Sequence, residues 1–288
     1  MLNTKEKILQ FFLLLYTFIY VKIASNKIHS VAMPEQFKKF DKLYAKNSTK
    51  KTLLKSEFKL LNWNIERAYQ IDKIKTYIEQ NNFDIILFQE TPTYSESEQP
   101  EFSKIKNFYA YCPAIFFNTK QKYEQFIHIG QLTLSDISFG EIKKILQPQV
   151  NFNSPFHCEH RFSLRNILYT RFFTKKGNLG IYNVHLEPFM KSKEKIKQLE
   201  CLAEEMKKNN DEYIILAGDW NILLREKKIF SDFLTEKRLL QAQTKGTSWK
   251  GIGTLDYIFH TQNMKVITGT DNFKASDHYP ICAKIELC

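Results

Sequence analysis

Apolar segments that end in acidic, amide or histidine residues recur along this 288-residue chain, and they constrain its fold more than any other feature. Residues 58–65 and 84–90 have the composition of buried strands, and residues 67–81 between them place apolar side chains at helical spacing. Residues 58–90 therefore match one strand–helix–strand unit. Polar residues at the ends of such strands lie where α/β sheets build their sites.

The rest of the chain continues this pattern without an internal repeat or a clear domain boundary after residue 58. The KKGN tetrapeptide between two apolar segments is typical of a hairpin turn. We expect residues 141–157 to form a loop, because two prolines interrupt them. Residues 102–117 are dense in aromatics, which fits either a core strand or a loop that enters a membrane. Strands are expected at 126–138, 165–174, 179–186, 212–221, 254–259, 264–269 and 279–287, and helices at 191–209 and 230–239.

An apolar segment, residues 8–21, lies near the N-terminus and follows two lysines. A basic start, a short apolar stretch and a small-x-small cleavage pattern describe a secretory signal peptide. An uncleaved membrane anchor over residues 8–24 and a buried core helix are the alternatives. We interpret residues 1–32 as a signal peptide or membrane anchor and expect a secreted or membrane-anchored protein.

The formal net charge is +11, but residues 1–57 hold 11 lysines against four acids, so most of the excess lies in this segment. We interpret residues 33–57 as a lysine-rich tether, with a basic stretch lying on anionic lipid as the alternative. The small excess that remains assigns no nucleic-acid partner by itself. A charged share of 25% and an aromatic share of 14% exclude a disordered chain, and five cysteines without a CxxC pair do not predict a zinc site.

Six short motifs at the ends of predicted strands carry the chemistry. Alone, an Asp or Asn beside a Gly indicates a turn, and a His on a strand is usually structural. Six such motifs in chain order are not explained by turns alone. They are NWNI (62–65), FQE (88–90), NVHLE (183–187), GDWN (218–221), LDYIF (255–259) and SDHYP (276–280).

This series resembles the endonuclease/exonuclease/phosphatase superfamily, which includes deoxyribonucleases, abasic-site endonucleases, sphingomyelinases and inositol-phosphate 5-phosphatases. The resemblance covers residues 58–288, and GDWN and SDHYP are its most specific parts. It implies an α/β fold built as a four-layer α/β/β/α sandwich, with two mixed β-sheets packed face to face and helices outside. It also implies a metal-dependent phosphoester hydrolase, so we take residues 58–288 as a catalytic domain and expect a monomer.

Three matched residues are candidate ligands of a divalent cation. Hydrolysis of a phosphate ester needs a cation on the phosphoryl oxygens, and Mg²⁺ prefers one or two carboxylates together with water. Glu90 places a carboxylate just past a rigid strand, and Asn64 lies at the end of the neighbouring strand. The resemblance places Asp277 on the metal side. We expect Mg²⁺, with Mn²⁺ or Ca²⁺ as alternatives.

Five further residues are candidates for the acid–base and binding steps. Asp219 and Asn221 are two positions apart, so on extended backbone their side chains face the same way and can orient a water molecule. His278 would act as general base or acid, because histidine titrates near neutral pH. By resemblance, Asp256 orients His278, and His185 donates a hydrogen bond to the phosphate.

The motif around His185 narrows the subclass. NVHL resembles the deoxyribonuclease-like and sphingomyelinase-like branch and differs from abasic-site endonucleases, whereas GDWNILL lacks the Tyr-Arg pair of the 5-phosphatases. The family's acid that orients His185 has no clear match, and Glu124 and Glu187 are the candidates. Arg165 could reach phosphate, but we interpret it as an exposed strand residue.

Three classes of function follow. The leading hypothesis is a Mg²⁺-dependent phosphodiesterase acting on nucleic acid, with a sphingomyelinase-like phospholipid phosphodiesterase as the alternative. In both cases the partner is a phosphodiester substrate, and residues 8–24 would add an association with membranes. The second class is a non-catalytic binding module on the same fold, which predicts lost catalytic residues. The third is a membrane-tethered interaction protein whose function resides in residues 1–57.

Overall fold

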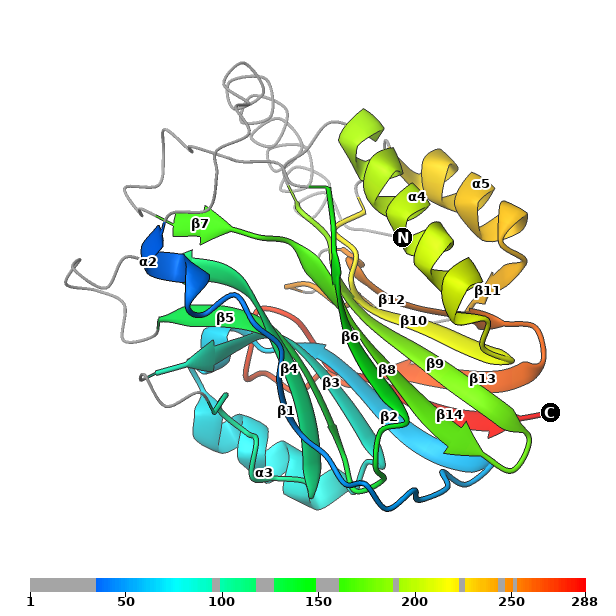
Figure 1. Ribbon diagram of the computed structural model, residues 1–288, viewed down its shortest axis with the longest axis horizontal. Coiled ribbons are helices and arrows are strands. Elements are labelled where there is room, and N and C mark those ends of the chain that lie inside the picture. The colour runs from blue at the N-terminus through cyan, green and yellow to red at the C-terminus, as the bar shows by residue number, and fades with distance from the viewer. Residues whose placement is uncertain are drawn as a thin grey trace.

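Two mixed β-sheets packed face to face form the centre of the molecule, and helices cover their outer faces (Figure 1). This computed structural model describes residues 35–94, 99–117, 127–148, 161–188, 192–222, 226–242, 247–250 and 253–288. A short helix, α2 (Glu35–Lys38), precedes the first strand.

The first sheet has eight strands among the described residues. At its centre, β2 (Glu57–Asn64) and β3 (Ile85–Thr93) are parallel, and α3 (Ile71–Asn81) connects them. The other strand pairs described in this sheet are antiparallel. The order is β1 (Tyr44–Lys46), β4 (Phe108–Phe117), β5 (His128–Ser135), β3, β2, β14 (Ile281–Leu287) and β13 (Met264–Thr270), and β7 (Arg161–Ser163) pairs with β4.

The second sheet has six described strands and repeats the same plan. Here β9 (Gly177–His185) and β10 (Tyr213–Asp219) are parallel, and α4 (Ser192–Asn209) connects them. The helix α5 (Lys227–Glu236) follows β10. The order is β11 (Leu239–Gln241), β12 (Asp256–Thr261), β10, β9, β8 (Asn166–Thr174) and β6 (Glu141–Leu146).

Three apolar clusters separate four layers. The cluster between the sheets takes Leu60 and Leu87 from the first sheet and Phe172 and Ile215 from the second. On the outer face of the first sheet, α3 buries its apolar side, and α4 and α5 do the same on the second (Figure 1). Burial of apolar area between layers is the main force that holds such a sandwich together. The α/β/β/α sandwich expected from the sequence is therefore confirmed.

Two expectations about secondary structure are wrong. The helix expected from residue 67 begins at Ile71, because residues 66–68 have left-handed backbone and form a separate turn, η2 (Glu66–Ala68). Residues 141–146, expected in a loop, form the edge strand β6. Its lysines obscure the strand signal, since charged residues are common on edge strands.

The aromatic segment that the sequence left open is a core strand. Residues 108–117 form β4, which lies between β1 and β5, and the described side chains along most of its length are buried. The alternative of a loop that enters a membrane is therefore wrong for these residues.

Residues 44–57 correct the extent of the expected tether, because they are part of the folded domain. Tyr44 is buried in β1, and Leu54 lies in the core between the sheets. The side chain of Asn47 donates to the carbonyl of Phe139 and accepts from its N–H, both at 2.9 Å. The lysines between Tyr44 and Leu54, which make this segment look like a tether, have exposed side chains.

The predicted signal peptide or anchor lies outside the described residues, as does the whole of 1–34. Within the part of the chain that the structure describes, none of the helices has the length and apolar character needed to cross a bilayer. The membrane segment stays a prediction.

Leu54 and its neighbour Leu53 provide a matched test of where the domain begins. Leu54 is 3% exposed, so Leu54→Ala should lower the free energy of unfolding by about 2–4 kcal/mol. Leu53 is 51% exposed, so Leu53→Ala should cost at most about 0.5 kcal/mol. Chemical denaturation measures both values. If both substitutions changed the free energy of unfolding by the same small amount, residues 44–57 would be a tether rather than part of the domain.

Candidate active site

One cleft of about 400 Å³ opens where the two parallel strand pairs end. Parallel strands bring their carboxyl ends to the same edge of a sheet, so residues far apart in sequence meet there. β2 and β3 contribute from the first sheet, and β9 and β10 contribute from the second. The cleft is lined by seven of the eight predicted site residues, namely Asn64, Glu90, His185, Asp219, Asn221, Asp277 and His278.

Three site residues form a row across neighbouring strands of the second sheet. Asp219 is in register with His185 on β9 and with Asp256 on β12. Next to it, Gly218 has φ of 151°, and a Cβ at this position would lie 1.8 Å from the carbonyl oxygen of Val184. A side chain at position 218 would push β9 and β10 apart, so glycine sets the spacing of the row.

Asp219 accepts polar contacts from four other residues. Its Oδ1 accepts a hydrogen bond from the backbone N–H of Asn221 at 3.1 Å. Its Oδ2 accepts one from Nδ2 of Asn64 at 3.1 Å. The same oxygen lies 3.5 Å from Nε2 of His185 and 3.8 Å from Nε2 of His278. One carboxylate therefore links both sheets and the segment that precedes β14.

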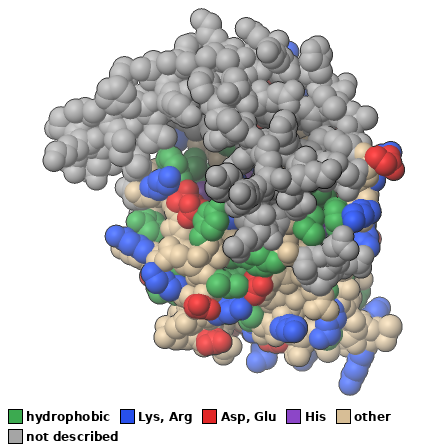
Figure 2. All heavy atoms as spheres, turned by 90° about the vertical axis from the view of Figure 1, so that its left-hand side faces the viewer, with side chains coloured by type: hydrophobic (Ala, Val, Ile, Leu, Met, Phe, Trp, Pro, Cys, Tyr) green, Lys and Arg blue, Asp and Glu red, His purple; other side chains and the backbone are tan. Residues whose placement is uncertain are grey.

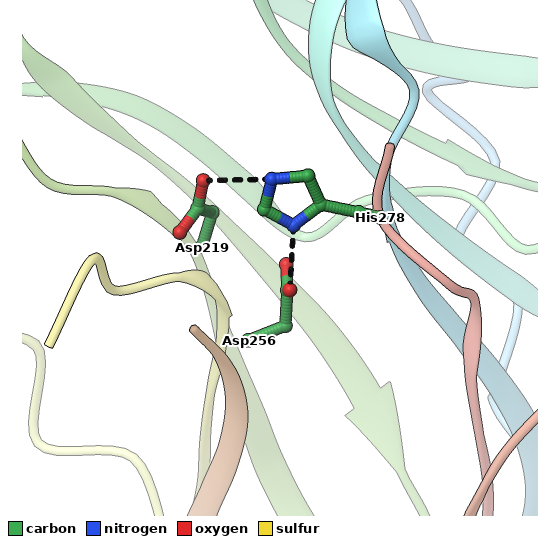
Figure 3. A group of neighbouring side chains, drawn as sticks. All are labelled: Asp219, Asp256 and His278. Atoms are coloured by element: carbon green, nitrogen blue, oxygen red, sulfur yellow. Dashed lines mark hydrogen bonds and ion pairs between the residues drawn. The ribbon is translucent and has the colours of Figure 1, made fainter. Parts of the chain in front are cut away.

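His278 and Asp256 form a buried pair (Figure 3). Nδ1 of His278 lies 2.7 Å from Oδ2 of Asp256, and Nε2 on the other side of the ring faces Asp219. Hydroxyl groups fix the backbone of both partners, since Ser248 accepts from the N–H of Asp256 and Ser276 from that of His278. The imidazole is thus held with one nitrogen free to address the cleft.

Burial and charge set the protonation of these groups. Burial alone lowers the pKa of His278, but the carboxylates of Asp256 and Asp219 outweigh it and raise the pKa to about 10. Burial raises the pKa of Asp219 above its ordinary value, and the charge of His278 opposes this. Burial, followed by the charges of Arg165 and His278, holds the pKa of His185 well below its ordinary range. His278 is therefore an imidazolium and His185 a neutral imidazole at neutral pH.

A second group of acids, Glu66, Glu90 and Asp277, lies on the side of the first sheet. Oε2 of Glu66 accepts the backbone N–H of Asp277 at 2.9 Å. Burial and then the charges of Asp277 and Glu90 raise the pKa of Glu66. Glu90 has φ of 59° at a bulge in β3, and its carboxylate lies 3.4 Å from Nδ2 of Asn64.

This donor set fits a hard divalent cation. Burial raises the pKa of Glu66, and the charges of Asp277 and Glu90 raise it further; a cation would offset these charges, and carboxylate oxygens are the ligands that Mg²⁺ and Mn²⁺ prefer. Glu66, Glu90 and Asp277 would hold the ion, with Asn64 beside them.

Asp219, Asp256 and His278 also offer ligand atoms that all lie within 4.8 Å of one another. The bond between Asp256 and His278 already occupies two of these atoms. We therefore infer that the cluster of Asp219, Asp256 and His278 serves proton transfer rather than metal binding.

Comparisons with known proteins agree with this geometry. The model of the Endonuclease/Exonuclease/phosphatase family matches residues 61–278. The chain belongs to this family. No curated protein sequence matches the chain at a significant level.

Solved structures share the family fold at low sequence identity. An endonuclease/exonuclease/phosphatase from Beutenbergia cavernae is 15% identical with a TM-score of 0.64, over 80% of this chain and 72% of that one. The human Nocturnin catalytic domain with bound sulfate is 14% identical with a TM-score of 0.61, over 90% and 100%. The mannosyl-6-phosphatase of Bacteroides thetaiotaomicron is 14% identical with a TM-score of 0.58, over 79% and 99%.

The structure brings together all eight residues predicted from the family motifs, since Asp256 lies directly behind His278. One side prediction is wrong. Arg165 is 5% exposed and lines the cleft, so it is not an exposed strand residue. Glu187 pairs with Nε of Arg165 at 2.7 Å, and a role in orienting His185 stays a prediction. The other candidate, Glu124, lies outside the described residues.

Several cleft residues were missed from the sequence. Glu66 follows Asn64 by two positions in the NWNIER segment, so the rule that polar residues cluster at strand ends would have included it. Trp249 donates its indole N–H to Oδ2 of Asp277 at 3.2 Å. Arg67 and Tyr69 also line the cleft. Trp249, Arg67 and Tyr69 belong to none of the six motifs, and their positions depend on the conformation of loops.

Glu66→Gln tests the proposed metal ligands without reference to any substrate. Loss of one carboxylate should weaken the binding of Mn²⁺ at least about 10-fold, given the size of ligand and outer-shell effects in metal sites. Calorimetric titration of the metal into full-length protein measures the dissociation constant. Glu79→Gln, on the exposed side of α3, is the control. Equal affinities in both variants would remove Glu66 from the site.

Proposed function

We propose that the protein is a divalent-metal-dependent phosphodiesterase that acts on nucleic acid. The observation that carries this proposal is the meeting of four acids, two histidines and two amides around one cleft. Family membership makes the hydrolysis of phosphate esters the expected reaction. All eight predicted residues are present, which argues against a binding module with a decayed site.

The acids of the first sheet serve the phosphoryl group. Glu66, Glu90 and Asp277 would hold a divalent cation, which would supply positive charge to the phosphoryl oxygens. Asn64 joins the two halves of the site, because its Nδ2 lies near both Glu90 and Asp219. His185, neutral and buried, keeps one N–H with which to bind a phosphoryl oxygen.

Asp219 and Asp256 on the second sheet, together with His278, would activate the attacking water and stabilise the negative charge that develops on the phosphoryl and leaving oxygens. Asp219 is placed to accept a proton from the attacking water, and the Asn221 backbone fixes its other oxygen. His278 presents Nε2 to the same space, with Asp256 stabilising its charge from behind. As an imidazolium it donates to the phosphoryl or leaving oxygen rather than acting as the base.

The rim of the cleft favours a substrate with flat groups. Tyr69 is 62% exposed and lines the cleft together with Arg67, whose Nη1 lies 3.2 Å from the tyrosine hydroxyl. An exposed aromatic beside an arginine is a common platform for stacked bases. One argument for the alternative substrate, a phospholipid, is lost because residues 108–117, in the aromatic segment, form a core strand.

Charge on one face of the molecule is mixed. On the face shown in Figure 2, the described basic and acidic side chains are interspersed, without an extended patch of one sign among them. Long-range attraction of a polyanion needs such a patch. For a substrate that approaches over this face, binding would therefore depend on contacts inside the cleft.

Activity of the full-length protein with Mg²⁺ on supercoiled DNA, single-stranded oligonucleotide and sphingomyelin vesicles tests the function. Glu90→Ala and His278→Ala should each lower turnover by about 10²–10⁴-fold, because they remove a metal ligand and an acid–base group. EDTA should abolish cleavage in the wild type. Thermal melting shows whether the variants stay folded.

The outcomes separate the substrate classes. Cleavage of DNA that both variants lose supports the nuclease, whereas headgroup release from sphingomyelin would replace it with the phospholipid reading. Unchanged turnover in both variants would falsify the mechanism. Inactivity on all three substrates would move the proposal to phosphomonoesters or to a binding module.

Tyr69→Ala tests the substrate class through the rim. Loss of one stacked base costs about 1–3 kcal/mol, so KM for a single-stranded oligonucleotide should rise about 5- to 100-fold with little change in kcat. Dimethyl phosphate, which has no nucleobase, should be cleaved equally by the wild type and the variant. Tyr94→Ala is the control, because Tyr94 is also exposed but does not line the cleft. An unchanged KM would exclude base stacking at this position.

A further inference from the structure

A fully buried ion pair lies beneath the cleft and has no part in the chemistry above. Nζ of Lys195, on α4, lies 3.1 Å from Oε2 of Glu226, next to the start of α5, and both side chains are completely buried. Removing two charges from water is expensive, and apolar residues of the same size often stabilise a protein as well or better. Stability alone therefore gives a weak reason for this pair.

The lysine also bonds to the active-site loop. Nζ of Lys195 donates to the main-chain carbonyl of Asn221 at 2.7 Å. This hydrogen bond is shorter than the contact of 3.1 Å between the same ammonium group and Glu226. A charged donor makes such a bond stronger than a neutral one. The carbonyl is thus held from the side of α4, away from the cleft.

Asn221 needs such a constraint. Its φ of 47° is left-handed, which costs a non-glycine residue about 1 kcal/mol or more. This conformation lets its N–H reach Oδ1 of Asp219 at 3.1 Å while its side-chain amide donates to the carbonyl of Leu186 at 3.1 Å. The lysine bond acts on the third polar group of the same residue. Together, the three bonds fix the residue that orients Asp219.

We propose that Lys195 is a positioning residue of the active site, which holds Asn221 in its left-handed conformation, and that Glu226 is the counter-ion that keeps the ammonium in place. Lys195 acts through Asn221 and Asp219 and does not reach the cleft. Its effect on turnover rests on the proposed phosphodiesterase function. Its effect on the conformation of Asn221 does not depend on that function.

Substituting both partners separates positioning from stability. Lys195→Met alone leaves Glu226 buried without its counter-ion, and this unpaired charge would destabilise the whole fold whatever Lys195 does at the site. In Lys195→Met/Glu226→Leu, both charges are gone and apolar groups fill the space, so the melting temperature should stay near that of the wild type. Lys197→Met, at an exposed position on the same helix, is the matched control.

The first readout is the conformation of the loop in the absence of substrate. Two-dimensional ¹H–¹⁵N spectra contain the side-chain amide of Asn221 and the indole N–H of Trp220, which donates to the carbonyl of Tyr257. Both signals should shift in the double variant and stay unchanged in Lys197→Met. Unshifted signals in the folded double variant would overturn the proposal, whatever the protein hydrolyses.

The second readout is turnover on the substrate that the wild type cleaves. The double variant should lose about 10- to 100-fold in kcat with KM little changed, since small misplacements near reacting atoms cost on this order. Normal kcat in a folded double variant would overturn the catalytic part. A wild type without activity would count against the proposed function, and the Asn221 and Trp220 signals would still decide the positioning role.

A double variant that does not fold leaves a test on the wild type. A buried ammonium bonded to a carbonyl exchanges slowly with water, so the Lys195 signal should be visible in ¹⁵N spectra and coupled across the bond to the Asn221 carbonyl. A rapidly exchanging or uncoupled Lys195 ammonium would overturn the proposal.

Discussion

The site depends on the hydrogen-bond register of β9, β10 and β12. Backbone pairing alone places His185, Asp219 and Asp256 side by side, and Gly218 allows β9 and β10 the close approach that keeps them in reach of one another. A slip of one residue would turn every side chain of a strand to the opposite face. The apolar clusters that flank the second sheet fix this register, so packing far from the cleft determines its geometry.

Electrostatics divides the cleft into two halves with different needs. Burial and then the charges of Asp277 and Glu90 raise the pKa of Glu66, which a cation would offset, whereas the carboxylates of Asp256 and Asp219 outweigh burial and raise the pKa of His278. Several residues that shape these halves have left-handed backbone, including Glu66, Glu90 and Asn221. Such strain persists only where surrounding structure enforces it, and it concentrates at functional sites. Here the bulge in β3 and the turn η2 enforce it on the metal side.

The sequence predicted most strands, the layer order and the proximity of the eight motif residues, because buried strands and their polar ends leave a strong local signal. It failed where local pattern and tertiary context disagree. The lysines of β6 and of residues 44–57 resemble a loop and a tether, although pairing with β8 and β4 orders both segments. Arg165 looked exposed because its partner Glu187 is 22 residues away, and no local pattern reports such a pair.

Three of the four layers contribute contacts to the cleft or to the loop that lines it. The two sheets supply the acids and histidines, and Asp219 joins them because it contacts Asn64 across the interface. The outer helices appear remote, yet Lys195 connects α4 to the main chain of Asn221. A residue buried in an outer layer is therefore bonded to the main chain of Asn221, whose own N–H bonds to Asp219. The short GDWN loop thus receives bonds from three layers, namely from Asn64 of the first sheet, from Leu186 beside β9 of the second sheet, and from Lys195 of α4.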